Sequence, residues 1–214
     1  MNKNSHSDVP NAVVNRMSLY LRELQHLLRE EKKTISSTKL GRLLGITDAQ
    51  VRKDFAYFGQ FGYPGIGYRC EELVDEIRRI LGTDRIWPAA MVGVGNLGQA
   101  LLGYQGFTGQ GFSVRAAFDI DTQVVGKEIC GLTVHHMSEL TEIVRQKAIQ
   151  LAILAVPANA APEVAEQIVD SGITGVLNFA PVTLNLPKSV SVVGVDLAME
   201  LEQLAFAVVS KSEK

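Results

Sequence analysis

The sequence contains little cysteine, and its two thiols, Cys70 and Cys130, lie far apart without a CxxC spacing. Neither a disulfide framework nor a zinc site is indicated, and we expect no metal. No apolar run approaches the length of a bilayer-spanning helix, and the polar start MNKNSHSDVPN does not resemble a signal peptide. These absences predict a cytoplasmic protein with reduced cysteines and no membrane partner.

A strong net charge of one sign is also absent, since the 214 residues carry a net charge of only -2. The charges are nevertheless unevenly placed: residues 1–88 hold 14 basic and 11 acidic side chains, whereas residues 89–214 hold 7 and 12. The basic excess is concentrated in residues 16–53, with 9 basic against 4 acidic. A basic N-terminal module and an acidic C-terminal module indicate two tasks, the first directed at a polyanion.

A glycine-rich motif organises the C-terminal module. The apolar stretch 89–92 predicts a strand, residues 96–104 predict a helix, and residues 114–118 predict a second strand that ends on Asp119. Between the first strand and the helix lie Gly93, Val94, Gly95, Asn96, Leu97 and Gly98. This order predicts a dinucleotide-binding half-domain: the first glycine allows a tight turn, the second lets backbone approach a diphosphate, and the third allows close helix packing.

Asp119 lies 21 residues beyond Gly98, where an acid can bind a ribose 2′-hydroxyl. No arginine stands beside it to bind a 2′-phosphate, so NAD or NADH is favoured over the NADP forms. The alternative is a Rossmann-like domain that binds no dinucleotide, or that binds another nucleotide such as CoA.

Alternating strands and helices continue to the end of the module. Strands are predicted near residues 128–134, 151–156, 176–179 and 190–195, the last two of them buried, with a helix that Ser138 caps and another from Pro162. The pattern predicts an α/β fold with a parallel Rossmann-type sheet of six or seven strands. Because ligands bind at the carboxyl ends of such strands, Pro157, Asn178, Phe179 and Asp196 are expected near the cofactor.

Helical periodicity dominates the N-terminal module. A first helix is predicted over residues 10–31, and a second over 38–44, capped by Ser36 or Ser37, with Leu40, Leu43 and Leu44 turned inward. A turn at Gly45 leads to Asp48, which is expected to cap a third helix over 49–58. Two short helices joined by a glycine-containing turn predict a helix-turn-helix unit.

The third helix carries the side chains that would read DNA. Val51, Phe55 and Phe58 share an inward face, which places Gln50, Arg52 and Lys53 outward, where they can contact bases or phosphates. The alternative is a solvated charged face on a small helical bundle. The glycine-rich stretch 59–68 then predicts a hairpin, the wing of a winged helix, and a fourth helix over 71–81 ends at Gly82.

The last predicted helix, residues 196–209, has apolar side chains on nearly every face. Such a helix is buried against another module or subunit, so we predict a homodimer; packing on its own sheet is the alternative. Two-fold symmetry also suits a helix-turn-helix protein that binds palindromic double-stranded DNA.

An NAD-dependent oxidoreductase with an accessory DNA-binding domain is the rival interpretation. Beyond the sheet the sequence offers only one helix, which leaves no room for a substrate domain. The pair His135-His136 falls in a connection, and Tyr104 has no lysine in helical register with it. We therefore expect no catalytic residues and a binding protein instead of an enzyme.

These motifs resemble the Rex family of redox-sensing transcriptional repressors. The matching stretches are SS at 36–37, QVRKD at 50–54, YFG at 57–59, GIGY at 65–68, the motif 93–98, AFD at 117–119, VP at 156–157, NFAP at 178–181 and VD at 195–196. The resemblance implies a winged-helix domain at 1–84, a Rossmann domain at 85–195 and a swapped dimerisation helix with its tail at 196–214. It further implies a dimer that binds a palindromic operator and releases it when NADH binds.

Carried over to this sequence, the resemblance implies three groups of residues. The DNA contacts would be Arg52 and Lys53, supported by Ser36, Ser37, Gln50 and Arg16. The dinucleotide would be held by the glycine motif and Asp119. A coupling group would consist of Arg22, Tyr104 and Asp196, whose carboxylate exchanges between tyrosine and arginine. One departure is Pro64 in the wing, where the family often has a basic residue; Arg69 is the candidate substitute.

The charge of the nicotinamide ring supplies a physical mechanism. The oxidised ring is positive and the reduced ring is neutral, so a pocket lined by side chains such as Leu197 and Phe179 would accept the reduced ring at lower desolvation cost. Reversing a dimer's conformational preference from 1:99 to 99:1 needs roughly 5.5 kcal/mol, or about 2.7 kcal/mol from each of two sites.

Overall fold

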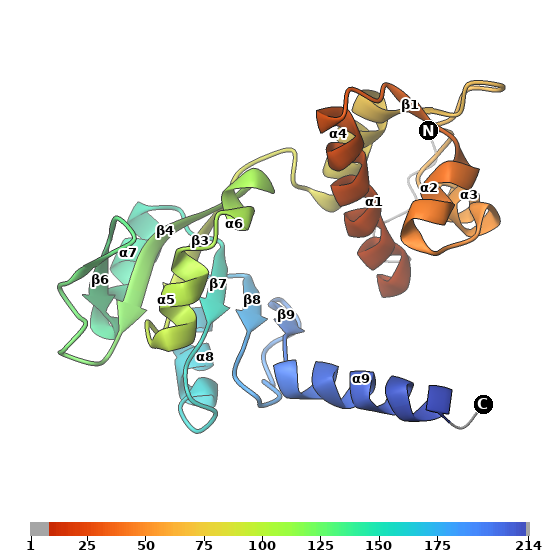
Figure 1. Ribbon diagram of the computed structural model, residues 1–214. Helices are drawn as coiled ribbons and strands as arrows, with labels where there is room; N and C mark the ends of the chain where they lie inside the picture. Colours follow the sequence, from red (N-terminus) through yellow and green to blue (C-terminus); the bar gives the residue numbers. More distant parts are fainter. Residues whose placement is uncertain (1–8, 213–214) are drawn as a thin grey trace. The chain divides into compact units, whose positions relative to one another are not determined.

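The computed structural model describes residues 9–212 and divides the chain into two compact units, Met1–Arg85 and Ile86–Lys214 (Figure 1). The first eight and last two residues, which belong to the predicted outer domains, lie outside the described part. Within residues 9–212, no helix is both long and apolar enough to cross a membrane. No group of three or more metal-ligating side chains occurs among the same residues.

The N-terminal unit is a small helical domain with a two-stranded sheet. Its elements are α1 (Asn11–Arg29), β1 (Thr34–Ile35), α2 (Ser37–Leu44), α3 (Asp48–Ala56), β2 (Tyr68–Arg69) and α4 (Cys70–Leu81). Side chains from every element form one core, in which Tyr20, Phe55 and Tyr68 meet with ring centroids 5.0 Å apart in successive pairs. The core is complete without contributions from outside the unit.

Local capping explains where α2 and α3 begin. The Ser36 hydroxyl accepts the Lys39 amide at the start of α2, and the Thr47 hydroxyl accepts the Gln50 amide at the start of α3. Gly45 joins them in a left-handed conformation, φ 68°. The prediction that Asp48 caps α3 was wrong, since Thr47 precedes it. Leu43 was also misplaced, because its side chain is 48% exposed, whereas Leu40 is buried.

The predicted wing is a tight turn that immediately precedes β2. Tyr63 and Gly67 exchange backbone hydrogen bonds of 2.8 and 3.0 Å around the exposed residues Pro64, Gly65 and Ile66. At the root of the turn, Gly67 has φ +87°, and a Cβ there would meet the Ile35 carbonyl oxygen at 2.5 Å. Glycine is therefore required where the wing passes β1.

The second unit contains a seven-stranded sheet in the order β5-β6-β4-β3-β7-β8-β9. The strands are β3 (Trp87–Val92), β4 (Phe112–Asp119), β5 (Glu128–Ile129), β6 (Leu132–His136), β7 (Leu151–Leu154), β8 (Gly175–Asn178) and β9 (Ser191–Gly194). All neighbours are parallel except β5 and β6. The order reverses at β3, as in a doubly wound Rossmann sheet.

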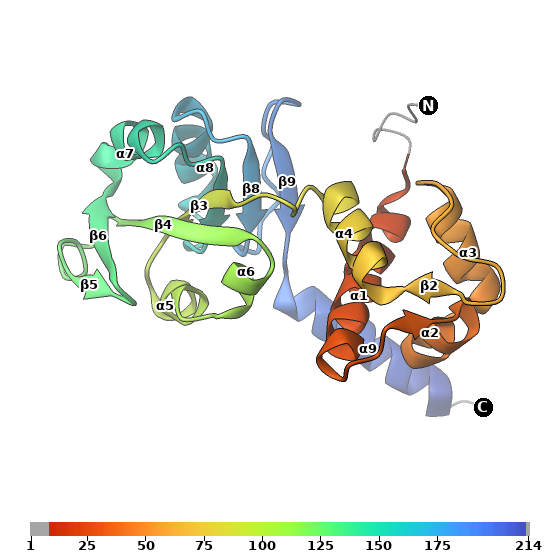
Figure 2. The same cartoon turned by 90° about the horizontal axis from the view of Figure 1, so that it is seen from above.

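Helices cover both faces of this sheet. On one face lie α5 (Asn96–Leu102) and α6 (Gly106–Gly109); on the other lie α7 (Leu140–Gln146) and α8 (Ala161–Asp170) (Figure 2). The region predicted as one strand over 128–134 is instead a hairpin, because Cys130 and Gly131, with φ 52° and 80°, turn the chain. A short 3-10 helix, η2 (Met137–Glu139), follows and is capped by His136, where we expected Ser138.

The C-terminal end of this unit leaves apolar surface uncovered. Strand β9 was predicted to be buried, yet all four of its residues are exposed. The last helix, α9 (Leu197–Ser212), extends away from the sheet, and Leu201 and Phe206 are 66% and 75% exposed (Figure 1). The alternative that this helix packs on its own sheet is therefore not what the chain does.

Candidate nucleotide cleft and nucleic-acid interface

A cleft of about 380 Å³ lies at the carboxyl ends of β3, β4 and β7. It brings together five of the sequence-predicted cofactor residues: Gly93, Val94, Gly95, Asp119 and Pro157. The lining also includes residues that sequence reasoning did not find, among them Gln99, Ile120 and Val124. Ile120 is 67% exposed although apolar, and its position directly after Asp119 was the available signal.

The three glycines of the motif differ in why glycine occupies each position. Gly93 has φ +91°, and a Cβ there would meet the Ala155 carbonyl oxygen at 2.5 Å; a Cβ on Gly98 would meet the Gly93 carbonyl oxygen at 2.0 Å. These two glycines are required by backbone packing. Gly95 has φ -70°, and its added Cβ would meet nothing within 4 Å. The protein itself does not require glycine there, so the bare backbone leaves space for a ligand.

The carboxylate of Asp119 joins β4 to the glycine loop. Its Oδ2 accepts the Val94 amide at 2.6 Å, and its Oδ1 accepts the amides of Ile120 and Asp121 at 2.7 and 3.0 Å. The Gln99 side chain donates to the Val94 carbonyl at 3.0 Å. The loop is thus held in shape by side chains before any ligand contributes.

The remaining predicted cofactor residues lie outside the lining of this cleft. Asn96 and Leu97 are exposed at the start of α5. Asn178 is buried, and its amide donates to the carbonyls of Ala180 and Val182 at 3.1 and 2.9 Å, so it shapes the turn after β8. Phe179 packs on the apolar layer between the sheet and α5.

Four predicted DNA-binding residues lie on the surface formed by α2 and α3. Arg52 donates to Asp48 at 2.7 Å and to the Ser37 hydroxyl at 3.2 Å, which links the two helices on their outer side. Lys53 and Ser36 are exposed nearby along the same helices. A groove of about 450 Å³ runs from Ser36 and Ser37 to the wing. Arg69, the candidate substitute for the wing cation, instead pairs with Glu72 and lies 4.8 Å above the Tyr63 ring.

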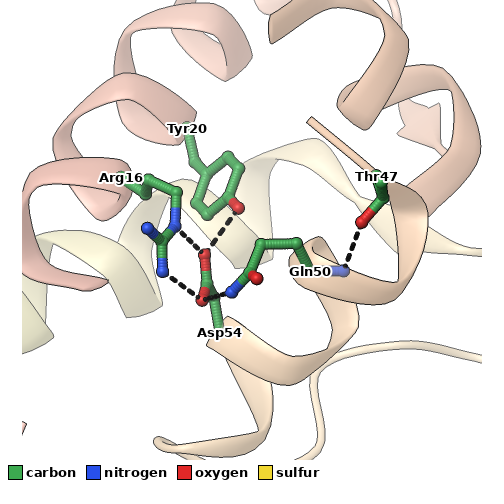
Figure 3. A network of polar contacts seen from close by, with 5 residues as sticks. All are labelled: Arg16, Tyr20, Thr47, Gln50 and Asp54. Carbon is green, nitrogen blue, oxygen red and sulfur yellow. Dashed lines mark hydrogen bonds and ion pairs between the residues drawn. The ribbon is translucent and has the colours of Figure 1, made fainter. Parts of the chain in front are cut away.

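The other two predicted DNA contacts take part in a polar network inside the N-terminal unit (Figure 3). Arg16 donates from Nε and Nη2 to Asp54 at 2.5 and 2.8 Å, Tyr20 donates to it at 2.8 Å, and Gln50 donates from Nε2 at 2.7 Å. The Asp54 side chain is 0% exposed. Sequence reasoning missed Asp54 and Tyr20 as a network, although the i,i+4 spacing of Gln50 and Asp54 was available.

The network keeps the buried Asp54 ionised. Burial by itself would raise the pKa of this carboxyl, but hydrogen bonds from Arg16, Tyr20 and Gln50 together outweigh burial and lower the pKa below its ordinary value. For Tyr20, burial and the hydrogen bond to Asp54 raise the phenol pKa well above its ordinary value. The hydrogen bond to Asp54 also raises the pKa of Arg16.

The predicted coupling group is divided between the two units. Arg22 is exposed on α1 in the first unit. In the second unit, Tyr104 is exposed and packs edge-on against Phe107, with ring centroids 5.1 Å apart, while the Asp196 carboxylate accepts the Ala198 amide at the start of α9. Within the second unit, Tyr104 and Asp196 therefore have different partners.

Two family models match the chain, one within the first unit and the other almost entirely within the second. Residues 8–56 match a model described as "Putative DNA-binding protein N-terminus", and residues 84–182 match one described as "CoA binding domain". The redox-sensing transcriptional repressor Rex of Syntrophobacter fumaroxidans is 44% identical over 199 residues, which are 92% of this chain and 95% of that protein. The chain belongs to the Rex family of redox-sensing transcriptional repressors.

Further members of the Rex family agree. The Streptomyces coelicolor repressor is 44% identical over 198 residues, 92% of this chain and 77% of that protein. A crystal structure of RSP in complex with beta-NAD+ and operator DNA is 33% identical and has a TM-score of 0.90, with 95% of this chain and 94% of that chain covered. RSP in complex with beta-NADH is 32% identical, with a TM-score of 0.87 and 96% of both chains covered.

These relatives confirm the predicted family and the predicted fold class, a winged helix-turn-helix unit followed by a Rossmann-type domain. They are named repressors, which confirms the prediction of a regulatory protein and not the rival prediction of an NAD-dependent oxidoreductase.

Proposed function

We propose that this protein is a homodimeric repressor in the cytoplasm that binds a palindromic operator and releases it when NADH binds. The observation that carries the proposal is the match, over almost the whole chain, to a repressor crystallised with beta-NAD+ and operator DNA and also with beta-NADH. The working parts would be the winged-helix domain at 1–84, the Rossmann domain at 85–195 and the C-terminal helix with its tail at 196–214.

The nucleotide would bind in the cleft at the carboxyl ends of β3, β4 and β7. The bare backbone at Gly95, with open space beside it, fits the approach of a diphosphate. Asp119 would bind the adenosine ribose, and its negative charge disfavours a 2′-phosphate, so NADH and NAD fit this cleft better than the NADP forms. Ile120 and Val124 offer an apolar wall for the adenine ring. Asn178 would act by shaping the turn after β8.

The operator would bind across α2, α3 and the wing. Arg52 and Lys53 are exposed on α3, and the groove between Ser36, Ser37 and the wing gives space for a sugar-phosphate strand. Arg16 and Gln50 would support this surface while bonded to Asp54. The basic excess of residues 16–53 supplies the electrostatic attraction.

A second copy of the chain would cover the apolar surface at the C-terminal end. The sheet face beside α6 carries an apolar depression of about 360 Å³, whose lining includes Leu151, Ile153, Leu177 and Val193. An apolar helix such as α9 from a partner would fill a depression of this kind and would hide its own side chains. Exchanged helices would also bring Asp196 of one chain close to residues of the other, as the coupling group requires.

Ring charge would make this dimer respond to redox state. When bound, the cofactor supplies only a difference in charge, since the oxidised nicotinamide is positive and the reduced ring is neutral. This chain would supply an apolar surface, Phe179 among it, that favours the neutral ring. Two sites that each provide about 2.7 kcal/mol would reverse the conformational preference of the dimer.

A mobility-shift titration tests the proposal directly. Palindromic duplexes selected by the protein from a random library are titrated with NADH and with NAD in separate series. We expect NADH to release the DNA and NAD to leave it bound. DNA that stays bound at saturating NADH would refute the proposed regulation.

Two variants separate the sites. Arg52→Ala should weaken DNA binding and leave NADH affinity unchanged, because Arg52 lies in the N-terminal unit. Asp119→Ala should weaken NADH binding, read as fluorescence of the reduced cofactor, with little effect on DNA. Equal losses on both ligands in either variant would contradict the separate assignment.

A further inference from the structure

The buried carboxylate of Asp54 joins residues that sequence reasoning placed on the DNA. Gln50 and Arg16 are bonded to the same Asp54 oxygen, Oδ1, at 2.7 and 2.8 Å, and Tyr20 and Arg16 Nε are bonded to Oδ2 (Figure 3). Asp54 thereby connects helix α3 to two successive turns of helix α1. The outer face of α3 is thus fixed from inside the domain.

The chemistry of a carboxylate adds a directional constraint. An ionised carboxylate only accepts hydrogen bonds, whereas a side-chain amide has one end that donates and one that accepts. Gln50 must therefore turn Nε2 toward Asp54, which leaves Oε1 and the second N–H of the amide for another partner. Recognition of adenine by glutamine uses both ends of the amide, so the amide's orientation decides which base edges it fits.

We propose that Asp54 is the positioning residue of the DNA reader: it orients the Gln50 amide and seats α3 on α1, and so sets base discrimination. This inference rests on the proposed DNA-binding function. Asp54 is buried and would not touch the operator itself. Arg16, with its guanidinium committed to Asp54, belongs to the same positioning group.

The test compares base preferences in variants of the full-length protein. Wild-type protein, Asp54→Asn, Gln50→Ala and Asp48→Asn each select duplexes from the same random library. Asparagine has nearly the shape of aspartate but keeps one acceptor oxygen in place of two, so it cannot accept from Gln50, Tyr20 and Arg16 in the same arrangement and no longer fixes the Gln50 amide. Asp48→Asn is the matched control, because Asp48 lies on the same helix with its carboxylate on the outer side, toward Arg52.

We expect Asp54→Asn to lose preference at the same base positions as Gln50→Ala, by about tenfold, the size of a single mismatched base pair. Binding to mixed-sequence DNA and its salt dependence should change little, since the phosphate contacts of Arg52 and Lys53 remain. The Asp48→Asn control should keep the wild-type preferences. An Asp54→Asn variant that keeps them too, or that weakens every duplex equally, would overturn the proposal.

Two further variants separate positioning from stability. Tyr20→Phe removes one hydrogen bond but keeps the charge and Gln50, so it should lower stability and preserve base preference. If Asp54→Asn does not fold, Arg16→Met/Asp54→Leu replaces the ion pair without leaving a buried charge, and it should show the same loss of discrimination. If wild-type protein selects no palindrome at all, the proposed function fails instead.

Discussion

The two units of this chain differ in how fully each one buries its own apolar side chains and pairs its own polar groups. In the N-terminal unit, all six elements share one core, and the buried carboxylate finds its donors inside the same unit. The C-terminal unit has a well-packed centre around β3 and β7, yet the four residues of β9 and the apolar side chains of α9 are exposed. The first unit buries its apolar residues within one chain, whereas the second leaves an apolar surface uncovered.

The difference between the two units matches two different structural requirements. A DNA reader benefits from rigid helices, because its side chains must match base edges. A unit that reports ligand binding to a partner needs an interface whose packing can change. The completed unit and the uncovered edge follow from these separate demands.

The largest expected effect comes from making α9 polar. Phe206→Glu puts a charge on an apolar side chain that is 75% exposed in the single chain, so it should not unfold the protein but should prevent burial in a dimer. We expect a monomer by sedimentation and a loss of operator affinity of about 100-fold or more, since bivalent contact is lost. Leu43→Glu, an exposed apolar residue of the complete unit, is the control for assembly and should remain dimeric.

The next effect tests whether the units are independent. Gly93→Val places a side chain where φ is +91° and where a Cβ meets the Ala155 carbonyl oxygen at 2.5 Å. We expect a destabilisation of about 3 kcal/mol or more in the C-terminal unit and loss of NADH binding. The unfolding of a separately expressed fragment 1–85, followed by circular dichroism in urea, should match the N-terminal transition of this variant. Loss of both transitions together would contradict the independence of the units.

A smaller effect is expected from the Asp54 network. Asp54→Asn should destabilise the N-terminal unit by about 3 kcal/mol, the low end for a broken buried pair, because the partner Arg16 is partly exposed.

The pH dependence of this difference has a definite sign. The folded-state pKa of Asp54 is lowered, so the contribution of its charge to stability is present above the unfolded-state pKa, about 3.9. It is lost as the pH falls through the lower folded-state value. Urea midpoints of wild type and Asp54→Asn should therefore differ clearly at neutral pH and converge in acid. A difference that grows on acidification would contradict this assignment.

The smallest effect is expected on the outer surface of the same helix. The Arg52–Asp48 pair is solvent-exposed on both sides, and such pairs contribute little. Asp48→Asn should leave the thermal midpoint of the N-terminal unit unchanged within error. A shift as large as that of Asp54→Asn would show that burial does not distinguish the two carboxylates.

Much of this architecture was accessible from periodicity and turn residues. The glycine motif, the helix ends at Gly45 and Gly82, and the strands that end before Gly93 and at Asp119 depend on local backbone requirements, which a sequence displays directly. The predicted strand at 128–134 was wrong because Cys130, which is not a usual turn residue, adopts φ 52° beside Gly131. The turn is Cys130-Gly131, which lacks the Asn-Gly, Asp-Gly or Gly-Gly pair that usually signals a two-residue hairpin loop.

The functional site was less accessible, since it depends on contacts between distant segments. Gln50 was expected on the outside because helical spacing excludes it from the apolar face. Its partner Asp54 is nevertheless satisfied by Arg16 and Tyr20, 38 and 34 residues away in the sequence. A charged residue in a hydrophilic stretch gives no sign that it is buried, so the network required the structure.

The hydrogen bond between Asp119 and the Val94 amide has a consequence for physiology. Because this carboxylate is already fixed at the rim of the cleft, a change of coenzyme preference would require rebuilding the glycine loop together with the end of β4. A regulator with this rim would respond to NADH, the coenzyme that catabolism reduces. It would not respond to NADPH, the coenzyme that supplies electrons for biosynthesis.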